Sequence, residues 1–169
     1  MEHENPADHK PGKKQTGDRG EALAAVWLES KGYRLLERNF RCRLGEIDLV
    51  AAQGEYVVFV EVKSRMADTP LHPSLSVTRA KQARLRRLGE FYCLTVLKAP
   101  RQPRFDVISV WLDPSDRMAA DSPETRNLLE PGNPPQGGQT NGNRGPIANS
   151  QDHTVRIRGN TLEHLMNAF

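Results

Sequence analysis

Asp48, Glu61 and Lys63 lie in two short, otherwise mostly apolar runs, GEIDLV at 45–50 and VFVEVK at 58–63. A charge in a half-buried strand is costly unless a metal ion or an oppositely charged group offsets it. Two neighbouring carboxylates repel each other unless a cation lies between them, and oxygen ligands of this kind suit a hard ion. The pattern therefore predicts a Mg²⁺ or Mn²⁺ site.

The two runs are expected to form a β-hairpin. β-Branched and aromatic residues are frequent in them, and the glycine-containing segment at 52–55 separates them. Side chains alternate between the two faces of a strand, so Ile47 and Leu49 should share one face while Asp48 takes the other. If the loop has an even number of residues, Asp48 falls on the same face as Glu61, either opposite or diagonal to it. An odd loop would send them to opposite faces.

A simpler interpretation requires no chemistry. Aspartate and a Glu-x-Lys motif are common on a solvated strand face, and a cross-strand pair between a lysine and a glutamate would account for them. Short motifs also match by chance. The residues that flank the hairpin are needed to decide between the two interpretations.

The flanking elements follow from the periodicity of apolar residues. Between Leu23 and Trp27 these residues have helical spacing, with Thr16 or Asp18 as the cap and a stop at 31–32. A second helix is expected from Thr78 to about Leu97. Strands are expected at 33–41, 45–50, 55–63 and 104–112. After the insertion, ordered structure is expected again at 154–157, followed by a turn at 159–160. The apolar residues at 162–169 should then dock on the core.

The order of these elements resembles the restriction-endonuclease-like PD-(D/E)XK nuclease fold. Motifs similar to those of the YraN-type family are RGE at 19–21, GY at 32–33, NFR at 39–41, GEIDL at 45–49, FVEVKSR at 59–65 and the C-terminal LEHLMNAF at 162–169. The resemblance covers residues 16–112 and 154–169. It implies an α/β fold with a mixed sheet of four or five strands, helices on both faces and a disordered insertion.

The resemblance also implies the site residues. Glu21, Asp48 and Glu61 would be metal ligands and, with Lys63, the catalytic residues. In such a site Mg²⁺ or Mn²⁺ polarises the scissile phosphate and lowers the pKa of a bound water, while the lysine stabilises charge or orients the nucleophile. Ile47 stands where the broader motif has its proline. The helix dipole alone would also favour a glutamate in the first turn, so Glu21 has a structural interpretation as well.

Positive charge is concentrated in one part of the chain. Residues 31–104 hold 15 Lys or Arg against 7 Asp or Glu, whereas residues 105–153 hold 3 against 7. A phosphate backbone would bind the basic part. Arg41, Arg43 and Arg65 are nearest in sequence to the proposed site and are expected to contact nucleic acid, because guanidinium groups match phosphate oxygens. Basic residues in the first half of the second helix face either nucleic acid or solvent: Arg79, Lys81, Arg84, Arg86 and Arg87.

Four segments are expected: a flexible N-terminal segment at 1–15, an endonuclease-like domain at 16–112, a disordered Pro/Gly-rich insertion at 113–152 and the C-terminal part of the domain at 153–169. The insertion contains six prolines and five glycines but no aromatic residue, so it cannot bury enough surface to offset the entropy of ordering. No apolar run is long enough for a membrane span and no secretory signal is visible, so a cytoplasmic location is expected.

Three hypotheses for function follow. The first is a metal-dependent nuclease-like protein that hydrolyses phosphodiesters in DNA or branched nucleic acid. At lower specificity the chain is also similar to archaeal Holliday junction resolvases, and junction cleavage would require a homodimer. The second is a nucleic-acid-binding module without catalysis. The third is an adaptor that binds partners through the disordered insertion.

Overall fold

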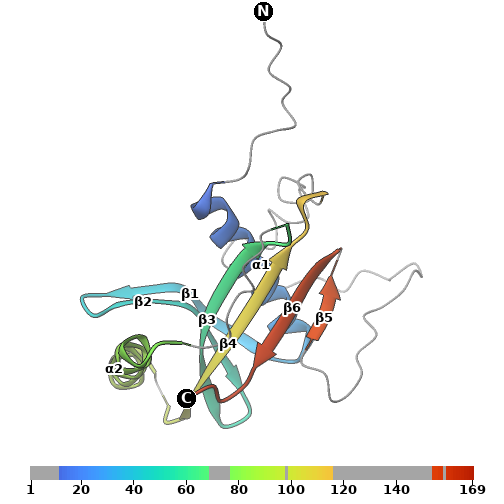
Figure 1. Ribbon diagram of the computed structural model, residues 1–169. Helices are drawn as coiled ribbons and strands as arrows, with labels where there is room; N and C mark the ends of the chain where they lie inside the picture. The colour runs from blue at the N-terminus through green and yellow to red at the C-terminus, as the bar shows by residue number, and fades with distance from the viewer. Residues whose placement is uncertain (1–11, 69–76, 98, 116–153, 158) are drawn as a thin grey trace, which may run out of the picture.

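The computed structural model describes residues 12–68, 77–97, 99–115, 154–157 and 159–169 (Figure 1). The insertion expected at 113–152 and the flexible segment expected at 1–15 fall mostly outside these residues. In chain order the elements are α1 (Lys13–Ser30), β1 (Arg34–Cys42), β2 (Gly45–Gln53), β3 (Tyr56–Met66), α2 (Arg79–Thr95), β4 (Gln102–Leu112), β5 (Thr154–Ile157) and β6 (Asn160–Leu165).

The strands form one mixed sheet in the order β1-β2-β3-β4-β6-β5. β3 and β4 are parallel and the other neighbouring pairs are antiparallel. A parallel pair needs a crossover connection, and here the connection includes α2. The expected mixed α/β sheet is confirmed, but it has six strands rather than four or five. The difference arises because β5 and β6 pair with each other and β6 also pairs with β4.

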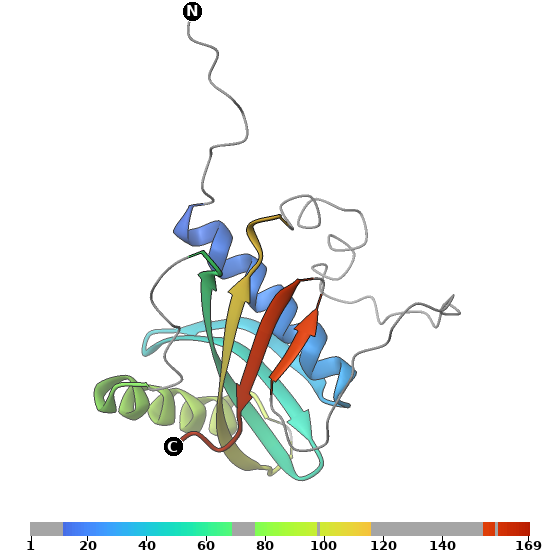
Figure 2. The same ribbon diagram turned by 45° about the vertical axis from the view of Figure 1, so that its right-hand side comes forward.

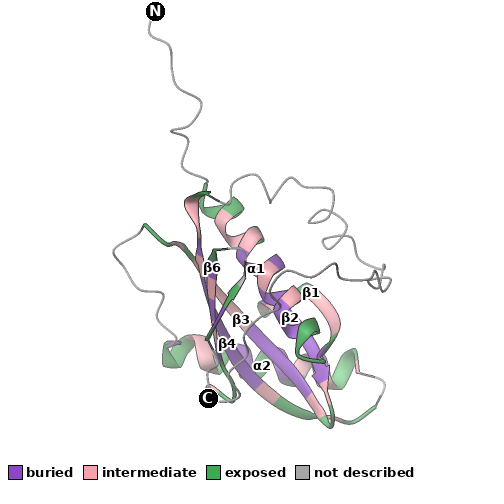
Figure 3. Cartoon of the chain, turned by 90° about the vertical axis from the view of Figure 1, so that its right-hand side faces the viewer, coloured by how far each residue is buried: buried purple, intermediate pink, exposed green. Residues whose placement is uncertain are grey.

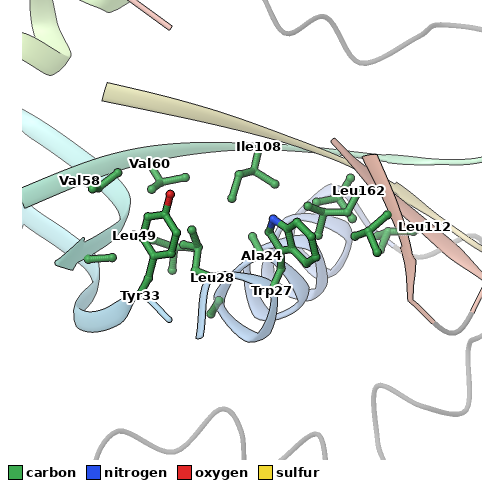
Figure 4. Close-up of a cluster of buried hydrophobic side chains, with 14 residues drawn as sticks. Ala24, Trp27, Leu28, Tyr33, Leu49, Val58, Val60, Ile108, Leu112 and Leu162 are labelled. Carbon is green, nitrogen blue, oxygen red and sulfur yellow. The ribbon is translucent and has the colours of Figure 1, made fainter. Parts of the chain in front are cut away.

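The two helices cover opposite faces of the sheet (Figure 2). Consecutive residues of β3 belong alternately to two buried clusters on opposite faces of the sheet, because side chains alternate along a strand. Val58 and Val60 pack with Trp27 and Leu28 of α1 (Figure 4). Phe59 packs in the other cluster with the buried residues of α2. Buried residues are concentrated on the central strands, which both helices cover (Figure 3).

The first helix starts earlier than the sequence suggests. It begins at Lys13, and its N-cap is Gly12, without a side-chain cap. Thr16 lies inside the first turn and donates its hydroxyl to the carbonyl of Gly12, so the prediction that Thr16 or Asp18 caps the helix is wrong. The second helix begins where expected, because the hydroxyl of Thr78 accepts a hydrogen bond from the backbone N–H of Lys81.

A close approach at Gly20 fixes α1 against β3. A Cβ atom at this position would lie 2.6 Å from the Cβ of Ser64 and would overlap its hydroxyl. Only a residue without a side chain allows this separation between helix and strand. The contact places the next residue, Glu21, near the C-terminal half of β3, where Ser64 lies.

Candidate active site

The register of the central hairpin brings two of the three proposed metal ligands, Asp48 and Glu61, to neighbouring positions. The turn between β2 and β3 consists of Gly54 and Glu55, which is an even number of residues, and Gln53 pairs with Tyr56. The ladder runs from this pair to Leu49–Val60. With this two-residue loop, Asp48 and Glu61 are the next residues on the two strands beyond the last pair of the ladder.

The side-chain alternation predicted for the first arm is wrong at Asp48. Leu49 packs on the α1 side of the sheet, whereas Ile47 packs on the α2 side, so these two residues do not share a face. Asn39 on the neighbouring strand lies between the pairs Arg38–Leu49 and Phe40–Ile47 and has a φ of 51°. A left-handed residue changes the direction of the strand, and asparagine tolerates this conformation better than most residues do.

Because of this break, the Asp48 carboxylate reaches toward β3. Its Oδ2 atom accepts a hydrogen bond of 2.7 Å from the backbone N–H of Val62, just beyond the last pair of the ladder. Burial and, after it, the negative charge of Glu61 raise the pKa of Asp48 to about 7, although the hydrogen bond from Val62 opposes both effects. Near neutral pH this carboxyl group is therefore only partly ionised.

Two lysines accompany Glu61. The Nζ atom of Lys81 on α2 lies 3.0 Å from Oε2 of Glu61, whose side chain is 12% exposed. Burial lowers the pKa of Lys63, the charge of Glu61 opposes this change, and the positive charges of Lys81 and Arg65 lower it further. Glu61 thus interacts electrostatically with Asp48 on one side and with Lys63 on the other.

Glu21 approaches from α1 and is half-buried. Burial raises its pKa, a hydrogen bond with the side chain of Asn39 opposes this effect, and the charges of Asp18 and Glu46 raise it further. The charge of Glu21 also contributes to the raised pKa of Asp48. Glu21 therefore adjoins the carboxylate pair, with Asn39 as its hydrogen-bond partner.

Two further residues lie at this site and are not predicted from the sequence, Asn39 and Lys81. Asn39 stands beside Asp48 and contacts Glu21. Its signal in the sequence is a polar residue within a predicted strand, in the NFR motif at 39–41. The sequence pattern places Lys81 on a basic helix surface. No feature of the sequence indicates its contact with Glu61.

The three arginines expected to contact nucleic acid are all exposed. Arg65 is near Lys63, as its effect on the pKa of that lysine indicates. Arg41 forms an ion pair with Glu46, at 3.1 Å between Nε and Oε2. Arg43 follows in the turn between β1 and β2. All three guanidinium groups are therefore accessible to a phosphate.

The donor atoms at the site suit a hard cation. In the described part of the chain, no group of three or more His, Cys, Asp or Glu side chains is arranged to hold a metal ion. Mg²⁺, however, is usually bound through one or two carboxylates and retains several waters, which suits the pair Asp48 and Glu61. The mutual repulsion that raises the pKa of Asp48 is the interaction that a bound cation would remove.

Asp106 has a structural role away from the carboxylate pair. It is fully buried, and its two oxygens accept hydrogen bonds from Arg104, at 3.0 and 2.8 Å. His164 Nε2 lies 2.9 Å from Oδ2, and the backbone N–H of Asn167 donates to Oδ1. Burial alone would raise the pKa of Asp106, but the hydrogen bonds from His164, Arg104 and Asn167 together lower it. Asp106 thus joins β4 to the C-terminal segment.

The fold and the site define an α/β protein whose mixed sheet carries a carboxylate pair and Lys63, while α2 contributes Lys81. The sequence model of Uncharacterised protein family UPF0102 matches residues 20–110, more than half of the chain, and the protein belongs to this family. This is the YraN-type family that the motifs indicate.

Curated relatives support the assignment. The chain is 51% identical to a UPF0102 protein of Moorella thermoacetica over 107 residues, which are 63% of this chain and 89% of the relative. It is 48% identical to a UPF0102 protein of Syntrophus aciditrophicus over 100 residues, 59% of this chain and 79% of the relative. None of the helices in the described ranges is long and apolar enough to cross a membrane.

Proposed function

We propose that this protein is a metal-dependent nuclease-like protein that hydrolyses phosphodiester bonds in DNA or branched nucleic acid. One observation carries the proposal: Asp48 and Glu61 follow the last pair of the β2–β3 ladder, and burial together with the charge of Glu61 raises the pKa of Asp48 to about 7. Buried like charges do not stabilise a binding module, whereas a cation site requires them. Lys63, next to this pair, adds the positive group that phosphodiester hydrolysis needs.

Each side chain then has a distinct task. Asp48 and Glu61 would hold Mg²⁺ or Mn²⁺, which supplies charge stabilisation at the phosphate and lowers the pKa of a coordinated water. The ammonium of Lys63 would stabilise the negative charge that develops on the phosphate or orient the attacking water. Glu21 would bind a water near the cation, held in place by Asn39.

The first test is a cleavage assay on flapped, branched and single-stranded DNA with Mg²⁺ or Mn²⁺. Asp48→Asn and Glu61→Gln should each reduce the cleavage rate by about 100-fold or more, while the circular dichroism spectrum stays unchanged. Glu55→Gln is the matched control, because Glu55 is an exposed carboxylate in the β2–β3 turn. Equal activity in all three variants would show that the cleavage comes from a contaminant.

A nucleic-acid-binding module without catalysis is the second candidate. It is favoured by the exposed arginines on α2, namely Arg79, Arg84, Arg86 and Arg87. This function predicts DNA binding that weakens steeply with salt, because cationic side chains release counterions from the phosphates. Salt-sensitive binding with no cleavage across the metals and substrates above would select this candidate over the nuclease.

A further inference from the structure

Lys81 makes the contact with Glu61 that a metal ion would be expected to make. Its Nζ atom lies 3.0 Å from Oε2, and the two side chains are 31% and 12% exposed. The positive charge of Lys81 also acts on Asp48, where it favours the ionised carboxylate. One ammonium group from α2 thus offsets part of the negative charge of both β-strand acids.

The contact provides charge without a directed hydrogen bond. Oε2 of Glu61 is buried, and no donor in the described residues reaches it with hydrogen-bond geometry, although Lys81 is close. A buried carboxylate oxygen without such a donor is poorly satisfied. A divalent ion would carry twice the charge of the lysine and could coordinate Asp48 and Glu61 together.

The backbone of Lys81 is fixed, but its side chain can move. Thr78 caps the first turn of α2 through the N–H of Lys81, and farther along the helix Leu85 and Leu88 are buried against the sheet. The lysine stem is flexible and ends in a compact charge. The ammonium can therefore leave Glu61 without a movement of α2.

We infer that Lys81 and a divalent cation exclude each other at Glu61, so that Lys81 neutralises this carboxylate in the metal-free protein and releases it when the ion binds. The inference rests on the proposed function, because it concerns the same site. Its physical basis is the repulsion between two cations that would contact the same oxygen atom. Lys81 is then a positioning residue that sets the affinity of the site for metal.

Mn²⁺ binding by isothermal titration calorimetry, without nucleic acid, tests the inference. Lys81→Met keeps the length of the stem but removes the charge, and it should tighten Mn²⁺ binding by about 10-fold. Arg79→Met is the matched control: it removes one positive charge from an exposed position in the same helical turn and should change the affinity by less than about 2-fold. Unchanged or weaker binding by Lys81→Met, or an equal gain in both variants, would overturn the inference.

A measurement on the wild-type protein avoids any effect of substitution on folding. Reductive methylation followed by mass spectrometry should modify Lys81 faster when saturating Mn²⁺ is present, while the exposed Lys13 reacts at an unchanged rate. An equal rate for Lys81 with and without Mn²⁺ would overturn the inference.

Failure of the inference can be distinguished from failure of the proposed function. If Lys81→Met binds Mn²⁺ more tightly but the protein cuts no substrate, the inference is supported and the proposed nuclease function is excluded. Cleavage that depends on Asp48 and Glu61, with equal Mn²⁺ affinity in Lys81→Met and the wild type, would overturn the inference alone. Absence of Mn²⁺ binding in both proteins would overturn both.

Discussion

At the scale of single residues, a polar row crosses the middle of an apolar sheet. Asn39, Asp48 and Glu61 follow one another on three adjacent strands. Their immediate neighbours along the strands, such as Ile47 and Val60, are fully buried. Apolar packing surrounds the row, while the backbone N–H of Val62 donates to Asp48 and charged side chains from both helices, Glu21 and Lys81, also approach it.

The raised pKa of Asp48 predicts how stability depends on pH. The folded protein has a pKa of about 7 at this position against an ordinary value of 3.8, so the unfolded chain binds fewer protons between these pH values. The contribution of Asp48 to stability therefore falls as pH rises from about 4 to 7. The free energy of unfolding in urea, measured without metal, should therefore change in favour of Asp48→Asn. Relative to the wild type, the variant should gain up to about 3 kcal/mol of stability as the pH is raised from 5 to 8. A difference between the two proteins that does not vary with pH would contradict the raised pKa.

Residue pairing could be predicted where it follows from chain geometry. The even loop brings Asp48 and Glu61 to neighbouring positions on the two strands, although the break in alternation at Asp48 could not be predicted. The reversal at Asn39 could not be predicted, since a left-handed φ is uncommon even for asparagine, which tolerates it better than most residues. The contact of Lys81 depends on how α2 is placed over β3, which the helical periodicity does not specify.

At the scale of elements, the distance between α1 and β3 is set by Gly20 and Ser64. The helices and central strands could be predicted because apolar residues repeat at helical or alternating spacing over long stretches. The first residue of α1 could not be predicted, because Gly12 at its N-terminus provides no side-chain cap. The strand β6 was expected only as a docked segment, since Asn160–Leu165 contains little of the β-branched composition that marks strands.

Gly20→Ala should disturb both stability and the site. The added methyl group would overlap Ser64. To relieve this overlap, α1 must move away from β3. Overpacking of this kind typically costs about 1–3 kcal/mol, measurable by urea unfolding. The displacement should also lower cleavage, because Glu21 is the next residue. Ser64→Gly in the same chain should recover most of the loss, and a double variant no more stable than Gly20→Ala would exclude this contact as the cause.

At the scale of the whole molecule, the C-terminal segment completes the sheet and reaches α2. β6 pairs with β4, and His164 and Asn167 contact the buried Asp106. The ring of Phe169 stacks on Phe105. The guanidinium of Arg86 on α2 lies 5.5 Å from the centre of the Phe169 ring. The docking of residues 162–169 expected from the sequence is confirmed.

Asp106→Asn tests how strongly the C-terminal segment depends on this network. The substitution would leave the largely buried guanidinium of Arg104, which is 12% exposed, without its charged partner. Breaking a buried ion pair costs about 3–5 kcal/mol, so the urea midpoint should fall markedly. Asp68→Asn, at an exposed position, should change stability by less than about 0.5 kcal/mol. Equal stability of the two variants would argue against a structural role for Asp106.

The central claim is that Asp48 and Glu61 together hold one divalent cation. The most direct measurement is the anomalous difference density of a crystal soaked in Mn²⁺ near neutral pH. The account predicts one peak within coordination distance of a carboxylate oxygen from each residue, with the ammonium of Lys81 withdrawn from Glu61. A saturated crystal with no peak between these carboxylates, and with Lys81 still in contact with Glu61, would contradict it.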